Sequence, residues 1–157
     1  MKIRPLLPTD YPTVQRIYNE GIATKMATFE TAAPDWEGWN KKFLPACRFI
    51  AEVDGKIGGW IALTPFSARH CYRGVAELSV YIGSDFRGQQ LGKRLLEHLI
   101  IAAPAAGFWT LQATIFAKNK ISIRLHENLG FRISGIRERI AQVDDEWCDT
   151  VLMERRF

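Results

Sequence analysis

A carboxylate, a glycine-rich loop and a helix-forming segment follow one another closely in the middle of the chain. Glu77 stands in the apolar run Val75–Ile82. The loop that follows this run carries one arginine and three glycines, which are Arg87, Gly83, Gly88 and Gly92. A loop that presents backbone N–H groups at the start of a helix binds phosphate groups. The sequence therefore predicts a pyrophosphate-bearing ligand beside a group that can transfer protons.

The run Val75–Ile82 alternates in character along its length. Its even positions are apolar, and they are Ala76, Leu78, Val80 and Ile82. Its odd positions Glu77, Ser79 and Tyr81 point to the opposite face of a strand, so one face is predicted to pack in the core and the other to line a site. Two interpretations of Glu77 are open at this point. It is either a half-buried acid paired with an arginine or a general base.

The segment Lys118–Leu129 is predicted to be a helix that carries polar groups on one side. Asn119, Ser122 and His126 fall within one narrow stripe at about 100° per residue. The adjoining stripe of Ile121, Leu125 and Leu129 is expected to pack on the sheet. Each polar group also has a structural interpretation, because Asn119 and Ser122 can cap the helix and His126 can be a buried structural histidine.

The segment Phe66–Gly74 is a loop rich in basic and aromatic residues, which are Arg69, His70, Tyr72 and Arg73. Such a loop is either a solvated surface or a binding site for an anionic substrate. In the second case an arginine would hold a carboxylate through two parallel hydrogen bonds.

Composition excludes several classes of protein. The chain has 157 residues and a net charge of +4, and no dense run of Lys or Arg indicates binding to nucleic acid or to a membrane surface. Cys47, Cys71 and Cys148 are scattered, which argues against a disulfide framework and against a zinc site. No metal site is predicted. The N-terminus lacks the apolar run of a signal peptide, so a reduced, cytoplasmic setting is expected.

Strands and helices are predicted to alternate along one domain that spans residues 1–157, and Thr9 is expected to cap the first helix. The expected strands are Lys2–Pro5, Arg48–Val53, Lys56–Thr64, Val75–Ile82, Trp109–Phe116, Arg132–Arg137 and Glu146–Arg156. The expected helices are Asp10–Ala23, Trp36–Leu44, Gly88–Ala103 and Lys118–Leu129, the last of them ended by Gly130. Turns are expected at Asp54-Gly55 and near Asp144-Asp145. The fold class is therefore mixed α/β with a central sheet flanked by helices.

This order of elements and motifs resembles the GNAT N-acetyltransferase superfamily over essentially the whole chain. The superfamily signature Gln/Arg-x-x-Gly-x-Gly/Ala corresponds to Arg87-Gly88-Gln89-Gln90-Leu91-Gly92, with Gln90 in place of its first glycine. Within the superfamily the chain is similar to the phosphinothricin N-acetyltransferase group. The stretches that carry this similarity are IYNEGI, MATFET, PFSARHCY, AELSVYI, RLHENLGF with His126, and EWCDTVLMERRF.

The resemblance implies a GNAT fold with a mixed, mostly antiparallel sheet, and acetyl-CoA as co-substrate. It implies acetylation of the α-amino group of a small amino acid such as phosphinothricin, methionine sulfone or methionine sulfoximine. Glu77 would act as the general base, and His126 or a nearby tyrosine would protonate the leaving thiolate. Substrate contacts would come from Phe29, Arg69, Tyr72 and Glu77. Cofactor contacts would come from Leu78, Val80, Arg87, Gly88, Gln90, Gly92, Lys93, Asn119 and Ser122.

The resemblance also implies a homodimer, to which the apolar strand Val151–Met153 would contribute. Two other functions remain to be weighed. One is acetylation of a protein N-terminus or lysine, which would need an open groove for a peptide. The other is a coenzyme A-binding module without catalysis, and Gln90 is the only feature that favours it.

Overall fold

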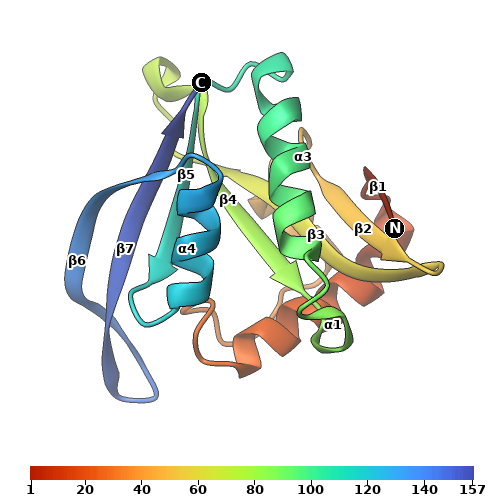
Figure 1. Cartoon of the computed structure of the whole chain (residues 1–157), viewed down its shortest axis with the longest axis horizontal. Coiled ribbons are helices and arrows are strands. Elements are labelled where there is room, and N and C mark those ends of the chain that lie inside the picture. The colour runs from red at the N-terminus through yellow and green to blue at the C-terminus, as the bar shows by residue number, and fades with distance from the viewer.

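The computed structural model describes residues 1–157, and its strands form one seven-stranded sheet in the order β1-β2-β3-β4-β5-β7-β6 (Figure 1). The strands are β1 (Lys2–Pro5), β2 (Phe49–Val53), β3 (Lys56–Pro65), β4 (Val75–Ile82), β5 (Thr110–Phe116), β6 (Arg132–Val143) and β7 (Glu146–Arg156). The α-helices are α1 (Tyr11–Ala23), α2 (Trp36–Lys42), α3 (Leu91–Ala105) and α4 (Lys120–Asn128). The mixed α/β fold predicted from the sequence is confirmed.

One pair of strands in the sheet is parallel, and that pair is short. Only residues Val75–Glu77 of β4 pair with β5, and their partners are Thr110–Gln112. On its other edge, β4 pairs with the antiparallel β3 as far as Ile82. The two parallel strands therefore start together and then diverge, as Figure 1 shows. Beyond Glu77 the edge of β4 that faces β5 has no strand partner, so the sheet opens at this point.

Helices cover both faces of the sheet, and each face has its own core. Under α3 and α4 the core includes Leu95, Leu96 and Leu99, all completely buried. Under α1 and α2 the core is largely aromatic, with Trp39, Trp60 and Tyr81 packed together. Burying a side chain of this size contributes about 2 kcal/mol to folding. The two cores hold the divergent strands β4 and β5 in a rigid frame.

The face of β4 that carries its odd-numbered residues was predicted to line a site, but part of it is buried in a second core. Tyr81 on this face is 9% exposed, and its ring stacks on Trp60 at a centroid distance of 4.9 Å. The reason is that α1 and α2 cover this face, so the alternation along β4 separates two cores instead of a core from solvent. The odd face is open only around Glu77 and Ser79, both half-buried.

Aspartates stabilise the 3₁₀ turn before α1 and the start of α2. Thr9 does not cap α1, because residues Pro8–Asp10 form a single 3₁₀ turn and the α-helix begins at Tyr11. The Asp10 carboxylate instead accepts a hydrogen bond from the N–H of Leu7 at 2.7 Å. Asp35 caps α2 by accepting the N–H of Gly38 at 2.8 Å. The prediction for Thr9 was therefore wrong by one residue, a common error at helix ends.

The apolar stripe predicted on α4 was partly wrong. Ile121 is 87% exposed, whereas Ile123 is 8% exposed and joins the core under α3 and α4. The reason is angular: Ile121 lies about 160° from Asn119 around the helix, and the side of Asn119, Ile123 and His126 faces the sheet. Leu125 and Leu129 pack against the edge of that core, as expected.

The two last strands form a long hairpin around the predicted turn. Asp144 and Asp145 both have positive φ angles, of 48° and 64°, which is the backbone of a tight hairpin turn. β6 continues to Val143 instead of ending at Arg137, with an irregularity in its pairing between Arg137 and Ala141. β6 lies at the edge of the sheet, so its sequence shows little alternation of apolar and polar residues from which the end of the strand could be predicted.

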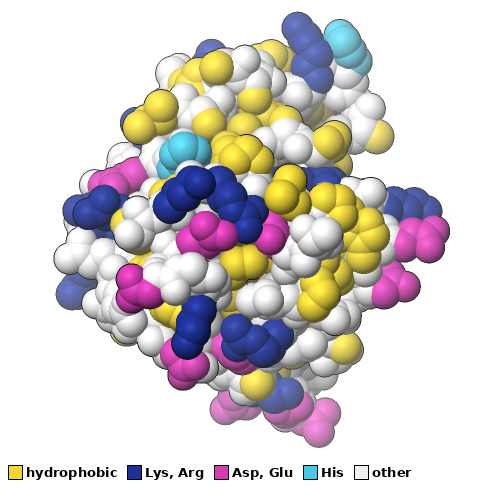
Figure 2. Space-filling model, turned by 90° about the vertical axis from the view of Figure 1, so that its right-hand side faces the viewer, with side chains coloured by type: hydrophobic (Ala, Val, Ile, Leu, Met, Phe, Trp, Pro, Cys, Tyr) yellow, Lys and Arg dark blue, Asp and Glu magenta, His cyan; other side chains and the backbone are white.

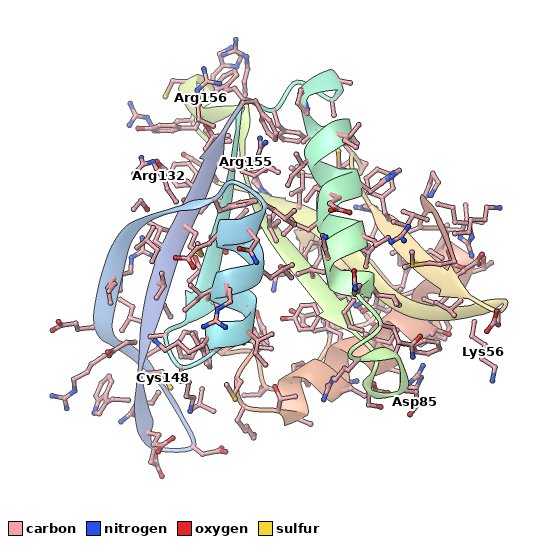
Figure 3. All side chains as sticks on the ribbon, in the orientation of Figure 1. Lys56, Asp85, Arg132, Cys148, Arg155 and Arg156 are labelled. Atoms are coloured by element: carbon pink, nitrogen blue, oxygen red, sulfur yellow. The ribbon has the colours of Figure 1, made fainter.

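The segment Val151–Met153, predicted to contribute to a dimer, is largely buried within the chain, and Leu152 is its one half-buried residue. Val151 and Met153 are 4% and 0% exposed and belong to the core under α3 and α4. β7 is an interior strand between β5 and β6, which explains the apolar run. At its end, Arg155 donates from Nε to the carbonyl of Leu129 at 3.0 Å and so closes the last turn of α4 next to Gly130 (Figure 3). Gly130 has a φ of +86°, as expected for the residue that ends a helix.

An ion-pair cluster ties the first strand to its neighbours. Both terminal nitrogens of Arg4 donate to the Asp10 carboxylate, at 2.7 and 2.9 Å, and Arg4 also donates to Glu52 at 2.7 Å. The hydrogen bonds from Arg4 hold the pKa of Asp10 below its ordinary value. Since the unfolded chain binds this proton more readily, the contribution is complete above the ordinary pKa and is lost as the pH falls through the folded value.

We therefore expect Asp10→Asn to lower the free energy of unfolding at pH 7 by about 2 kcal/mol, because it weakens two charge-assisted hydrogen bonds. The difference from the unmodified chain is expected to shrink as the pH falls below about 4, where Asp10 of the unfolded chain begins to take up a proton, and to vanish only below the lowered pKa of the folded chain. Urea unfolding at pH 7 and pH 3.5 measures both values. An equal difference at the two pH values would contradict this explanation.

The surface carries no dense cluster of one charge on the side seen in Figure 2, which faces along the sheet from the β1 edge. There Lys and Arg side chains alternate with Asp and Glu. None of the helices has both the length and the apolar character that crossing a bilayer would require. No three His, Cys, Asp or Glu side chains come together as metal ligands would, and all three cysteines are free.

Candidate active site

A cavity of about 450 Å³ lies where β4 and β5 diverge. Its walls come from both strands, from the start and middle of α4, and from the segment that joins α1 to α2. The side chains and backbone that line it include Met26, Thr28, Phe29, Lys42, Thr64, Glu77, Leu78, Val80, Tyr81, Thr114, Phe116, Asn119, Ser122 and His126. A space of this size accommodates a small molecule.

Glu77 is the only acid on the sheet side of this cavity, and it is held by neutral side chains. Gln112 donates to Oε2 at 2.7 Å and Thr114 donates to the same oxygen at 3.0 Å. No arginine forms an ion pair with Glu77, so the interpretation as a simple acid–arginine pair is wrong. Its carboxylate is half-buried and lines the cavity, where it can accept a proton from a ligand.

His126 is almost completely buried, at 1% exposure, and lines the opposite side of the cavity. Its Nδ1 lies 2.8 Å from the carbonyl of Ser122. A carbonyl only accepts, so Nδ1 carries the proton and Nε2 has a lone pair, which is buried and receives no hydrogen bond from the protein. Burial lowers the pKa of His126, because desolvation disfavours the charged ring. At neutral pH the ring is therefore neutral, with Nε2 free to accept.

The segment between α1 and α2 covers the opening between the divergent strands. The Phe29 ring packs on Phe116 of β5 at a centroid distance of 4.6 Å. The Asn119 side chain donates to the carbonyl of Met26 at 3.4 Å, while its Oδ1 accepts the N–H of Ser122 at 3.2 Å. Asn119 is thus the N-cap of α4, as its structural interpretation predicted, and also a tether for the covering segment. These contacts place the covering segment over part of the cavity, which remains open to solvent on one side.

The cation in the cavity wall is Lys42, which sequence reasoning did not single out. Its Nζ donates to Glu30 at 3.0 Å and approaches the Tyr18 hydroxyl at 3.4 Å. Arg69 and Tyr72 lie outside the cavity wall, both exposed, with the guanidinium over the tyrosine ring at 5.5 Å. The structure therefore brings Phe29 together with Glu77 but leaves the two other predicted substrate contacts on the surface loop.

The glycine-rich loop departs from a plain turn in two ways. Gly88 and Gln90 both have left-handed φ angles, of +76° and +62°, so α3 begins at Leu91 and not at Gly88. The backbone N–H groups of residues 88–93 donate to no protein acceptor. Unpaired N–H groups at the start of a fifteen-residue helix favour an anion through their partial positive charge. These are the N–H groups that the sequence predicts to bind phosphate, and they lie beside a hollow of about 350 Å³.

The predicted cofactor contacts fall into two groups. Leu78, Val80, Asn119 and Ser122 line the cavity with Glu77 and His126. Gly88 and Gln90 line the second hollow, and Arg87, Gly92 and Lys93 flank it in the same loop and helix turn. Leu78 and Val80 also belong to the part of β4 that has no partner on the β5 side. A long ligand with a pyrophosphate at one end can therefore run from the loop along the open strand edge.

Two residues that hold Glu77 were missed. Gln112 and Thr114 lie on β5, whose sequence from Thr110 to Phe116 reads as an apolar, buried strand. The available signal was the alternation itself, since Thr110, Gln112 and Thr114 place polar side chains on one face of that strand. When a buried strand with one polar face lies next to a strand that carries an acid, we expect its polar side chains to form hydrogen bonds with that acid.

Comparison with known proteins agrees with this geometry. The model of the acetyltransferase (GNAT) family matches residues 13–131. The L-methionine sulfoximine/L-methionine sulfone acetyltransferase of Pseudomonas aeruginosa is 30% identical, over 97% of this chain and 92% of its own. The structure of a phosphinothricin acetyltransferase from Sinorhizobium meliloti in complex with acetyl-CoA has a TM-score of 0.91 at 28% identity, covering 99% of this chain and 87% of that chain.

A third relative carries a different name. The structure of a ribosomal-protein-alanine N-acetyltransferase from Brucella melitensis also has a TM-score of 0.91, at 29% identity, and covers 100% of both chains. Names within this group of folds thus differ in the acceptor, while the acetyl transfer is common to all. The matched family model, the divergent strands and the glycine-rich loop lead to one conclusion. The chain belongs to the acetyltransferase (GNAT) family and is an acyltransferase enzyme.

Proposed function

We propose that this enzyme transfers the acetyl group of acetyl-CoA to the α-amino nitrogen of a small amino acid of the phosphinothricin, methionine sulfone or methionine sulfoximine type. The observation that carries the proposal is Glu77, which lies at the opening of the sheet and lines a cavity of about 450 Å³. The names of the Pseudomonas and Sinorhizobium relatives support the substrate class.

Acetyl-CoA would lie along the open edge of β4. Its pyrophosphate would accept hydrogen bonds from the N–H groups of residues 88–93, with Arg87 and Lys93 adding positive charge nearby. The pantetheine arm would follow the unpaired backbone from Leu78 to Val80 towards the cavity. Asn119 and Ser122 at the start of α4 would contact this arm from the other side. The acetyl group would then reach the cavity that Glu77 lines.

The reaction would proceed by direct attack. Glu77 takes a proton from the substrate ammonium, and the free amine then attacks the acetyl carbonyl. A backbone N–H at or near Val80 would donate to the developing oxyanion, since this part of β4 has no strand partner. Collapse of the tetrahedral intermediate breaks the C–S bond and leaves the amide and the coenzyme A thiolate. No covalent acyl-enzyme is required.

The leaving thiolate needs a proton, and the cavity holds two kinds of donor. His126 has no proton on Nε2 at rest, so it can serve only after it has taken one, for example from the attacking amine. Tyr81 keeps its hydroxyl proton, because burial raises its pKa far above neutrality. His126 would thus act as a shuttle, and Tyr81 would donate its proton only while it takes one from the attacking amine, because its raised pKa makes it a weaker acid than the thiol. Separate His126→Asn and Tyr81→Phe variants distinguish the two roles.

Substrate contacts are proposed from the cavity wall and its surroundings. Phe29 would wall the pocket, as it does already in the ligand-free cavity. Lys42 lines the cavity and would pair with the carboxylate of a substrate, and Glu30 and Tyr18 fix its position. Arg69 and Tyr72 remain predicted contacts for the acidic end of the substrate. Measuring KM for the amino acid in Arg69→Gln and Lys42→Gln variants assigns this role to one of them.

Gln90 is expected to weaken acetyl-CoA binding slightly. Its left-handed backbone carries a strain of about 1 kcal/mol for a residue with a Cβ, and its side chain stands in the loop that would cradle the pyrophosphate. We expect Gln90→Gly to lower KM for acetyl-CoA about three- to tenfold and to leave kcat within twofold. Initial rates over a range of acetyl-CoA concentrations measure both constants. A higher KM would show that the Gln90 side chain itself binds the cofactor.

A homodimer remains a prediction of the family resemblance. In the predicted contact segment Val151–Met153, Leu152 alone is half-buried, and the other two residues are buried in the core. Exposed apolar side chains instead lie on the β6–β7 hairpin, and they are Ile133, Ile136, Ile140 and Trp147. Sedimentation of the unmodified chain and of an Ile136→Lys variant tests whether this hairpin joins two copies.

Acetylation of a protein N-terminus is the second candidate, and the name of the Brucella relative favours it. The covering segment argues for the small substrate, because Phe29 and Met26 contact β5 and α4 across the cavity opening. Thiol release from acetyl-CoA tests the choice with phosphinothricin, methionine sulfone, methionine sulfoximine, glutamate and a peptide with a free N-terminus. Turnover of the peptide alone would move the function to protein acetylation.

A further inference from the structure

The carboxylate of Glu77 is bound at one oxygen only. Gln112 Nε2 lies 2.7 Å from Glu77 Oε2, and Thr114 Oγ1 lies 3.0 Å from the same oxygen. No protein hydrogen bond reaches Oε1. Both donors are neutral, so they orient the carboxylate and stabilise its charge through hydrogen bonds alone. No cation forms an ion pair that would block access to it.

The place of these donors follows from the pairing of the sheet. Glu77 and Gln112 face each other in the last pair of the short parallel ladder between β4 and β5. Thr114 is two residues further along the same face of β5, beyond the point where the strands separate, and its side chain lines the cavity with Glu77. Side chains of β5 therefore hold the Glu77 carboxylate at the point where β5 diverges from β4 and the cavity begins.

We propose that Gln112 and Thr114 are positioning residues that hold Glu77 Oε2 and leave Oε1 as the atom that takes the proton of the substrate ammonium. This inference rests on the proposed function, because it assigns a task to groups around its general base. Gln112 and Thr114 need not touch the substrate. They fix the direction of the one free oxygen.

Removal of one donor should change the pH dependence of the reaction. A carboxylate that loses a hydrogen bond to its charged form is protonated at higher pH. Since the reaction needs the deprotonated form, the acidic limb of the kcat/KM profile should move to higher pH. A role of Gln112 or Thr114 in folding alone would change the unfolding midpoint or the active fraction but would leave this limb in place.

The experiment compares three variants on β5 with full pH profiles. Thr114→Val removes the hydroxyl with little change in shape, Thr114→Ser keeps it, and Thr110→Val makes the same change on the same strand face without a bond to Glu77. We expect Thr114→Val to lower kcat about 10- to 100-fold and to raise the acidic limb by about one pH unit, with KM for acetyl-CoA unchanged. Thr114→Ser should restore most of both, and Thr110→Val should behave as the unmodified enzyme.

Variants of Gln112 give an independent check if Thr114→Val folds poorly. Gln112→Glu places a second carboxylate beside Oε2, and two carboxylates this close share one proton, so the acidic limb should rise by about two pH units or more. Gln112→Leu removes the donor and should resemble Thr114→Val. An acidic limb that stays in place in folded Thr114→Val, Gln112→Leu and Gln112→Glu enzymes would overturn the inference.

The Glu77→Gln background separates this inference from the proposed function. If Glu77 is the base and Thr114 acts through it, Thr114→Val should lower kcat no further when Glu77→Gln is already present. Full activity of Glu77→Gln alone would contradict the base itself. Loss of activity in Glu77→Gln, combined with an unchanged profile in Thr114→Val, would contradict only the positioning role.

Discussion

Replacing Glu77 by glutamine is expected to lower kcat/KM for the amino-acid substrate by about 10²- to 10⁴-fold at neutral pH. The change keeps the size and shape of the side chain but removes the only carboxylate on the sheet side of the cavity. Acetyl-CoA binding should persist, because the N–H groups of residues 88–93 and the open edge of β4 are untouched. Steady-state rates and calorimetric titration with acetyl-CoA measure the two properties.

The pH dependence of the loss identifies its cause. Raising the pH supplies more of the free amine from solution, so a missing base is partly compensated and the rate of Glu77→Gln should climb towards pH 9. A Glu37→Gln variant, with the same change at an exposed position in the first turn of α2, serves as the control and should keep full activity. Equal kcat/KM in Glu77→Gln and the unmodified enzyme at pH 7 would remove Glu77 from the mechanism.

Gly21→Ala is expected to destabilise the fold, although alanine favours helices over glycine by about 1 kcal/mol. Gly21 is buried near the end of α1, and a Cβ there would lie 2.5 Å and 2.7 Å from Cδ1 and Cε1 of Tyr81. The Tyr81 ring cannot move away, because Trp60 stacks on it at 4.9 Å and Tyr18 packs against it at 4.8 Å. Separating α1 from β4 should cost more than the helix gains.

We expect a net loss of about 2 kcal/mol and a fall in Tm of about 4–8 °C. Gly92→Ala is the matched control for stability, since a Cβ at that helical position meets nothing closer than 3.7 Å. That variant should be as stable as the unmodified chain or more so. Scanning calorimetry measures both, and a Gly21→Ala chain that melts at the same temperature as Gly92→Ala would show that the Tyr81 ring adapts without cost.

Much of the fold was readable because its signals are local. The Asp54-Gly55 turn set the β2–β3 hairpin, and both residues have the positive φ angles that such a turn needs. Gly130 marked the end of α4 in the same way. Ile121 was misplaced because residue type along a helix does not say which side meets the sheet. The second core was missed because the alternation of residues along β4 is the same whether helices cover one face of the sheet or both.

The site was predicted less completely than the fold. Glu77, Phe29, Asn119, Ser122 and His126 converge on one cavity, and sequence patterns together with family motifs had singled them out. Lys42 and Thr114 were missed because their place in the wall depends on how distant segments meet. The sequence distance between Thr114 and Glu77 gives no sign that the two strands are neighbours in the sheet. Only the pairing of β4 with β5 shows it.

The central claim is transfer of an acetyl group to the α-nitrogen of a small amino acid, and the product tests it most directly. Methionine sulfone and acetyl-CoA would be incubated with the enzyme, and fragmentation in a mass spectrometer would locate any acetyl group. The account predicts N-acetylmethionine sulfone in amounts equal to the thiol released, and a rate of formation at least about 100-fold lower with Glu77→Gln at neutral pH. Thiol release without acetylated amino acid, or acetylation confined to a peptide N-terminus, would contradict it.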